Sequence, residues 1–201
     1  MIPATEALER LRAGNRRFVA EVRSPDTVAS RSRRLELAAG QEPFAIILGC
    51  SDSRVPAELV FDQGLGDLFV IRVGGNIVAP SQIGSVEFAA ERFHTRLVVV
   101  MGHTQCGVVT AVVEELERPF SEQSKNQLSI LARVRPSVEA LLSKNLGHEA
   151  LVREAGRANI RASVDHLRHG STILEALIEK GSLLVVGAEY SLETGLVEFF
   201  D

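Results

Sequence analysis

The sequence has only two cysteines, no tryptophan and no long apolar segment. Two cysteines cannot form the disulfide framework of a small secreted domain. The longest apolar runs, such as Leu97–Met101, are far shorter than the roughly 20 residues that a bilayer-spanning helix needs. Residues 1–20 mix glutamate and arginine with apolar residues and lack the apolar core of a secretory signal. These absences predict a cytoplasmic protein without membrane contacts.

The charge balance also lacks an excess of basic residues. The 201 residues contain 22 Lys and Arg against 26 Asp and Glu, which gives a formal net charge of −4. General nucleic-acid binding requires a basic surface, so we expect no nucleic-acid partner. Hydrophobic residues make up 45% of the chain, which is ordinary for a globular protein with a core. The length fits a single domain over residues 1–201.

Four short apolar runs alternate with helix-like stretches. The runs are 44–48, 68–71, 97–101 and 183–186. Runs that are apolar at every position suit parallel strands buried on both faces. Strands that alternate with helices indicate an α/β fold. We predict a mostly parallel sheet of four to five strands in the order 2-1-3-4, flanked by helices, with 195–199 as an edge strand.

The beginning of the chain reads as a helical arm. Residues 4–20 carry an apolar stripe at helical spacing, and this stripe could pack across a partner subunit. We therefore divide the domain into a helical N-terminal arm over 1–40 and an α/β core over 41–201. Gly147 and Gly170 predict breaks in the long helical stretch that precedes the fourth run.

Sulfur and nitrogen ligands follow the first and third runs. Cys50 comes shortly after the first run, and His103 and Cys106 follow the third. Ligands of open parallel sheets bind beyond the carboxyl ends of the strands, so the three side chains converge if these strands are neighbours. Two thiolates and one imidazole suit Zn²⁺, and three protein ligands leave a fourth position open, as in catalytic zinc sites. Spacing alone leaves open that the cysteines are buried and unligated.

Asp52 and Arg54 stand two residues apart, close to Cys50, so both side chains can face the same side. An aspartate this near a metal would be either a fourth ligand or a hydrogen-bond acceptor beside the ligands. Arg54 can hold the carboxylate with two N–H groups and keep it ionised. The alternative is an ordinary surface ion pair, which would contribute little to stability.

Two segments resemble the signature segments of the β-class carbonic anhydrases. They are CSDSRVPAE at 50–58 and GHTQCG at 102–107. The resemblance runs over residues 4–199 and includes shorter matches, which are Gln41, Asp67–Arg72, Asn76 and Ser85–Ala89. Because both signatures occur together, in the family's order and separation, the match is specific.

The resemblance implies a β-carbonic-anhydrase-like domain that binds one Zn²⁺ per subunit. Cys50, His103 and Cys106 would hold the zinc. Asp52 would form a catalytic dyad with Arg54, or would close the resting site as a fourth ligand. The subunits would form a homodimer or a homotetramer, with a substrate cleft at the dimer interface. The residues expected to bind substrate are Gln41, Phe69, Phe88 and Gly107.

The implied activity is the reversible hydration of carbon dioxide to bicarbonate and a proton. Hydroxide on the zinc would attack the carbon while the Asp52/Arg54 dyad orients it, and activity would rise above neutral pH. One alternative is hydrolysis of carbonyl sulfide or carbon disulfide at the same site, and another is a non-catalytic zinc-binding protein. A redox switch, in which oxidation of Cys50 and Cys106 releases zinc, is compatible with the enzyme.

Two departures from the family pattern concern the pocket and its regulation. Gly74 stands where many members have a larger apolar residue, so we expect a different pocket shape. Ile47 stands where members with an allosteric bicarbonate pocket have tryptophan. Arg72 and Tyr190 match the other two residues of that pocket, so the resemblance implies at most weakened regulation of this kind.

Overall fold

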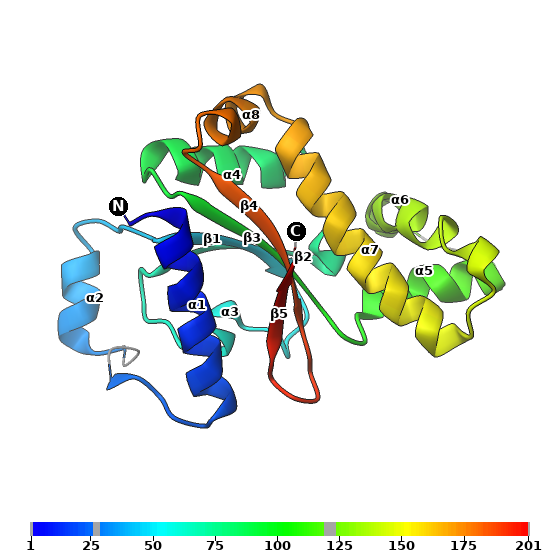
Figure 1. Ribbon diagram of the computed structural model, residues 1–201, viewed down its shortest axis with the longest axis horizontal. Coiled ribbons are helices and arrows are strands. Elements are labelled where there is room, and N and C mark those ends of the chain that lie inside the picture. Colours follow the sequence, from blue (N-terminus) through cyan, green and yellow to red (C-terminus); the bar gives the residue numbers. More distant parts are fainter. Residues whose placement is uncertain (1, 26–28, 119–123, 201) are drawn as a thin grey trace.

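A computed structural model describes residues 2–25, 29–118 and 124–200, and these form a sheet with helices on both faces (Figure 1). The strands are β1 (Ala45–Cys50), β2 (Leu68–Val73), β3 (Leu97–His103), β4 (Leu184–Tyr190) and β5 (Val197–Phe200). Their order is β2-β1-β3-β4-β5. The first four strands are parallel, and β5 runs antiparallel to β4. The predicted fold class and strand order are confirmed.

The helices lie before and between the strands. The α-helices are α1 (Ala4–Val19), α2 (Arg31–Leu37), α3 (Ala57–Val60), α4 (Pro80–Arg92), α5 (Gly107–Glu117), α6 (Lys125–Glu139), α7 (His148–His169) and α8 (Thr172–Glu179). Short 3₁₀ turns are η2 (Gly74–Asn76) and η3 (Leu142–Lys144). Helix α7 starts after Gly147 and ends at Gly170, as the two glycines predicted. Among the described residues, no helix has the length and apolarity to cross a membrane.

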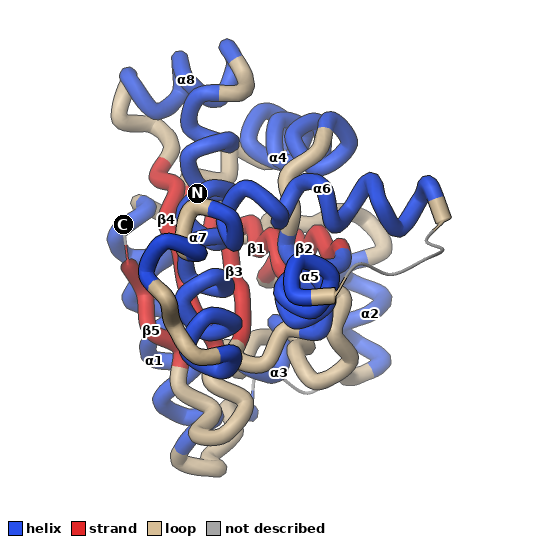
Figure 2. Tube along the Cα trace, turned by 90° about the vertical axis from the view of Figure 1, so that its right-hand side faces the viewer, coloured by secondary structure: helices blue, strands red, loops and turns tan. Residues whose placement is uncertain are grey.

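The central strands β1 and β3 are buried at every position. Alternate side chains of a strand point to opposite faces. Ile47 therefore packs with residues of α1 and α3, while Ile46 and Leu48 pack with residues of α4, α7 and α8. Both views show α1 and α3 on one side of the sheet and α4 and α8 on the other (Figures 1 and 2). The continuous apolar runs are thus explained by burial on both faces.

Strands β1 and β3 extend further than their apolar runs. The runs stop at Leu48 and Met101 because glycines follow, but the strands continue to Cys50 and His103. Position 102 needs a glycine because α7 packs closely there. A Cβ at this position would lie 2.6 Å from the Ile160 side chain. Cys50 and His103 are therefore the last residues of their strands, where the hydrogen bonds of the sheet fix their backbone.

The strand order places a topological switch between β1 and β3. The chain leaves β1 for β2 on one side of the sheet, while β3 pairs with β1 on the other side, with Gly49 opposite Met101. Diverging connections open a crevice at the carboxyl ends of such strands. This is the end at which Cys50 and His103 lie.

Helix α1 is anchored to its own chain through Asn15. This side chain is only 4% exposed. Its Nδ2 donates to the Val60 carbonyl at 3.1 Å and to the Gly195 carbonyl at 2.8 Å, and its Oδ1 accepts from the Val197 N–H at 2.9 Å. Leu11, in the apolar stripe of the same helix, is fully buried in this chain. The stripe that the sequence offered to a partner therefore packs on the chain's own core.

We expect Asn15→Ala to destabilise the fold. The substitution leaves two carbonyls and one N–H without this partner, at a cost of about 2–4 kcal/mol for three hydrogen bonds. Urea unfolding at fixed chain concentration measures the change. Asn126→Ala, at an exposed position of α6, is the matched control and should change the midpoint little. Equal midpoints for the two variants would contradict the anchoring role.

Candidate metal centre

Cys50, His103 and Cys106 come together at the carboxyl edge of the sheet. One ligand atom from each residue lies within 4.8 Å of the others, and all three residues are buried. The two Sγ atoms are 4.0 Å apart, and both cysteines are free. Cys50 ends β1, His103 ends β3, and Cys106 is the N-cap of α5. The convergence predicted from the strand ends is present in the structure.

Two left-handed turns shape this cluster. Gln105 has a φ of 55°, which turns the chain so that Cys106 comes back beside His103. Gly75 in η2 has a φ of 68°, and its N–H donates to Cys50 Sγ at 3.4 Å. Glycine adopts this conformation readily, whereas a residue with a Cβ rarely does. The left-handed turn at Gln105 therefore needs support from residues outside the segment that joins His103 to Cys106.

The His103 ring presents an unpartnered nitrogen. Its Nδ1 donates to the Thr104 carbonyl at 2.8 Å, which leaves Nε2 as the acceptor nitrogen. Nε2 is buried and has no hydrogen-bond partner. A buried acceptor without a partner is costly unless another group satisfies it. Two sulfurs and this nitrogen are the donor set that Zn²⁺ prefers, so the residues present fit the metal.

Without a metal, the pKa values of the two thiols are shifted in opposite directions. A hydrogen bond from Cys106 is the largest effect, and it lowers the pKa of Cys50 to about 4 against the opposing effect of burial. The same bond raises the pKa of Cys106, although the backbone N–H groups of Val108 and Val109 at the start of α5 act to lower it. A bound cation would favour the thiolate form of both residues.

Asp52 and Arg54 form a charged pair beside the cluster. Asp52 Oδ1 accepts from the Arg54 N–H and Nε, both at 2.9 Å, and Oδ2 accepts from Nη2 at 2.7 Å. This hydrogen bonding holds the pKa of Asp52 well below its usual range. Oδ2 lies 3.8 Å from His103 Nε2. The structure therefore pairs Asp52 with Arg54.

Three hydrogen bonds to backbone carbonyls place the charged pair. Arg54 Nη2 also donates to the Gln105 carbonyl at 3.3 Å, in the segment between the other two candidate ligands. Arg72 donates through Nε to the Cys50 carbonyl at 3.0 Å and through Nη2 to the Asp52 carbonyl. The backbone from Cys50 to Asp52 is therefore held from β2, and the guanidinium of Arg54 is held from the loop after β3.

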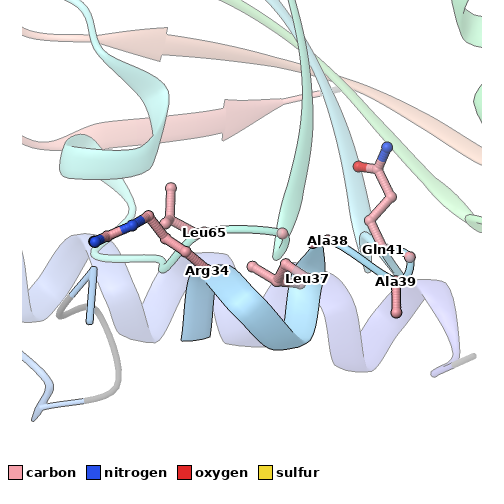
Figure 3. Close-up of a pocket in the computed structure, with 8 residues that line it drawn as sticks. Arg34, Leu37, Ala38, Ala39, Gln41 and Leu65 are labelled. Carbon is pink, nitrogen blue, oxygen red and sulfur yellow. The ribbon is translucent and has the colours of Figure 1, made fainter. Parts of the chain in front are cut away.

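The predicted substrate residues divide into two groups. Gly107, the first residue of α5, lies next to Cys106, where an added Cβ would meet open space. Gln41 precedes β1, so the length of this strand, roughly 17–20 Å for its six residues, separates it from Cys50. Gln41 lines a pocket of about 520 Å³ with residues of α2 and Leu65 (Figure 3).

The two phenylalanines also lie away from the cluster. Phe69 pairs with Ile46 near the amino end of the sheet, whereas Val73 at the other end of β2 pairs with Cys50. Phe88 of α4 is 54% exposed, and its ring lies 6.4 Å from that of Phe69. Folding of one chain therefore brings together the predicted ligands, the charged pair and Gly107, but not Gln41, Phe69 or Phe88.

The two departures from the family pattern, Gly74 and Ile47, have different surroundings, and Tyr190 matches the pattern. A Cβ on Gly74 would meet Val108 Cγ2 at 3.4 Å and Ile130 at 3.8 Å, so side chains of α5 and α6 line that space. Ile47 is fully buried in β1. Tyr190 is buried at the end of β4, and its ring lies 6.4 Å from that of Phe18.

Residues around the ligands were not found by sequence reasoning. Asn159 Nδ2 of α7 donates to the Gly75 carbonyl at 2.8 Å and so holds the turn whose N–H reaches Cys50. Glu193 accepts hydrogen bonds from Thr104 and Gln105. These contacts join residues far apart in the sequence, and no motif or period marks them.

The sequence of this chain is similar to those of known carbonic anhydrases. The sequence model of the carbonic anhydrase family matches residues 45–197. Carbonic anhydrase 2 of Mycobacterium tuberculosis is 39% identical over 189 residues, which cover 94% of this chain and 89% of that protein. A carbonic anhydrase of Pseudomonas aeruginosa is 34% identical over 188 residues, with 88% and 82% covered.

Solved structures show the same fold. The β-carbonic anhydrase CcaA has a TM-score of 0.75 with 26% identity, and the alignment covers 96% of this chain and 95% of that one. A chain from a study of two tetrameric β-carbonic anhydrases of Sordaria macrospora has a TM-score of 0.74 with 25% identity, with 83% and 85% covered.

We expect the cluster to bind a divalent metal that prefers sulfur and nitrogen. Titration of metal-free protein with Co²⁺ should produce thiolate-to-cobalt charge-transfer absorption that saturates at one equivalent per chain. Cys106→Ser should weaken binding by at least about tenfold, because loss of a ligand is no milder than loss of a supporting contact. Ser51→Ala, at an exposed position beside Cys50, is the control. Equal binding by the two variants would exclude Cys106 as a ligand.

Proposed function

The chain belongs to the β-carbonic anhydrase family, and from that premise we propose that it is a zinc enzyme that catalyses the reversible hydration of carbon dioxide to bicarbonate and a proton. One observation carries the proposal. Two thiol sulfurs and an unpartnered imidazole nitrogen lie together, with an ionised carboxylate 3.8 Å from that nitrogen. This arrangement offers a metal site and an acceptor beside it.

The proposed ligands are Cys50, His103 and Cys106, with one Zn²⁺ per subunit. When bound, zinc supplies a nucleophilic hydroxide near neutral pH by lowering the pKa of water. The hydrogen bond from His103 Nδ1 to the Thr104 carbonyl fixes the tautomer of the neutral ring, so that Nε2 is the nitrogen left to bind a metal. Ligation through two thiolates supports a reducing compartment such as the cytoplasm.

Asp52 is the proposed acceptor that orients the nucleophile. Its carboxylate would accept a hydrogen bond from the O–H of the nucleophile. The nucleophile would then direct an oxygen lone pair at the carbon of carbon dioxide. Arg54 holds both carboxylate oxygens, so Asp52 stays ionised and cannot rotate freely. The N-terminus of α5 at Gly107 carries the positive end of the helix dipole, which favours an anionic product such as bicarbonate.

We further propose that the active enzyme is a homodimer or homotetramer. Gln41, Phe69 and Phe88 lie too far from the cluster of their own chain to contact its substrate. Phe88 and Phe93 form an aromatic surface with Phe69 on α4 and β2, and this supports contact with a second copy. The related Sordaria macrospora enzymes are described as tetrameric.

Asp52→Asn tests the proposed mechanism. The variant keeps the shape of the side chain but removes its charge and the full strength of its pairing with Arg54. We expect stopped-flow hydration of carbon dioxide, measured at pH 7 and 8.5, to fall at least about tenfold while zinc content stays the same. Asp165→Asn, an exposed aspartate paired with His169, is the control. Unchanged turnover in Asp52→Asn would exclude the assigned role.

Phe88→Glu tests the proposed assembly. A charge at an apolar interface opposes association, so we expect the dissociation constant between subunits to rise at least about tenfold. Light scattering measures the mass of the assembly. The zinc content of the variant should not change, because Phe88 lies away from the proposed ligands. Leu142→Glu in η3 replaces another exposed apolar residue and should leave the mass unaltered. A dissociated variant with full activity would refute the need for a partner.

A further inference from the structure

The turn between β4 and β5 reaches the loop that carries two of the proposed ligands. Glu193 lies in this turn. Its Oε2 accepts from Thr104 Oγ1 at 2.9 Å, and its Oε1 accepts from Gln105 Nε2 at 2.7 Å. Thr104 and Gln105 are the two residues between His103 and Cys106. One carboxylate therefore holds the whole segment that spaces these ligands.

The same two residues support the site through their carbonyls. The Thr104 carbonyl accepts from His103 Nδ1, and the Gln105 carbonyl accepts from Arg54 Nη2. A rotation of either peptide would thus disturb the His103 ring or the guanidinium that holds Asp52. Placement of the segment affects both the ligands and the charged pair.

The segment has a backbone conformation that needs support. Gln105 has a φ of 55°, in the left-handed region that residues with a Cβ seldom occupy. Its side chain is held by an ionised acceptor, and hydrogen bonds of this type are stronger than neutral ones. Thr104 is fixed by two further bonds: its N–H donates to the Tyr190 carbonyl, and its Oγ1 accepts from the Leu192 N–H, both at 3.0 Å.

Glu193 is itself held in place. Ser191 Oγ donates to Glu193 Oε2 at 3.1 Å and accepts from the Thr194 N–H at 3.1 Å. Asn15 fixes the far side of the turn at Gly195. Because Glu193 is exposed at the edge of a pocket of about 420 Å³, its removal leaves the core intact.

We propose that Glu193 is a positioning residue for the metal centre: its carboxylate clamps Thr104 and Gln105 and thereby sets the spacing of His103 and Cys106 and the placement of Arg54. The inference rests on the metal ligands named in the proposed function. It assigns to the β4–β5 turn a role that touches neither metal nor substrate.

The test compares zinc release to excess chelator among variants of the full chain. Glu193→Ala should release zinc about tenfold faster than the native chain, as expected for a contact that supports ligands. Glu193→Gln keeps the length but offers one acceptor oxygen in place of two, so its rate of zinc release should lie between those of the native chain and Glu193→Ala. Glu198→Ala, an exposed glutamate of β5 paired with Arg157, is the matched control and should release zinc at the native rate.

A double-mutant cycle separates clamping from a general loss of structure. Thr104→Val removes the hydroxyl that Glu193 binds, so Glu193→Ala should have a smaller effect in that background than in the native chain. The cobalt charge-transfer spectrum should shift in Glu193→Ala, and the melting temperature of the metal-free variant should stay near that of the native chain.

Several outcomes would overturn the proposal. They are equal zinc release by the Glu193→Ala and Glu198→Ala variants, additive effects in the cycle, and zinc release by Glu193→Gln that is as fast as that by Glu193→Ala. A native chain that binds zinc but does not hydrate carbon dioxide would refute the proposed function alone. A native chain that binds no zinc would refute both.

Discussion

Parallel pairing of β1 with β3 is the interaction on which the rest of the site depends. Cys50 and His103 are far apart in the sequence, and they meet because these strands run in the same direction and end at the same edge. Both strands are buried on both faces, so a shift in register would expose or bury several side chains wrongly. The free energy that fixes the metal ligands is therefore the burial of aliphatic side chains elsewhere in the sheet.

The same edge concentrates charge in a way that suits a cation. A carboxylate, two cysteine sulfurs and an imidazole nitrogen lie within a few ångströms of one another. Such groups would repel or remain unsatisfied unless donors surround them. Arg54 satisfies the carboxylate, the Gly75 N–H reaches the Cys50 sulfur, and the start of α5 faces Cys106. His103 Nε2 alone lacks a partner among the described side chains of the cluster, and a bound metal would meet that need.

Local sequence signals predicted the sheet and the ligand set but not the contacts that hold them. Apolar runs marked the four parallel strands, and Gly147 and Gly170 marked the ends of α7. The runs ended early at Gly49 and Gly102, because glycine carries no apolar signal although the backbone continues as a strand. Asn15, Asn159 and Glu193 left no signal, since each binds backbone or side chains distant in sequence. Gln41 and Phe88 follow only from the family resemblance, and within this chain they lie away from the candidate ligands.

These distant contacts form a continuous polar path from the first helix to the metal centre. Asn15 of α1 holds the β4–β5 turn at Gly195 and Val197, and the other side of that turn binds Thr104 and Gln105 through Glu193. At the other cysteine, Asn159 of α7 holds the η2 turn, and the Gly75 N–H in that turn donates to Cys50 Sγ. Each proposed ligand is thus supported by an element that contributes no ligand itself. Preorganised ligands lose little freedom when a metal binds, so the outlying helices have a direct effect on the site. Helix α1 holds the turn whose Glu193 binds the segment between His103 and Cys106, whereas Cys50 is held from β2 and α7, so the arm supports two of the three proposed ligands.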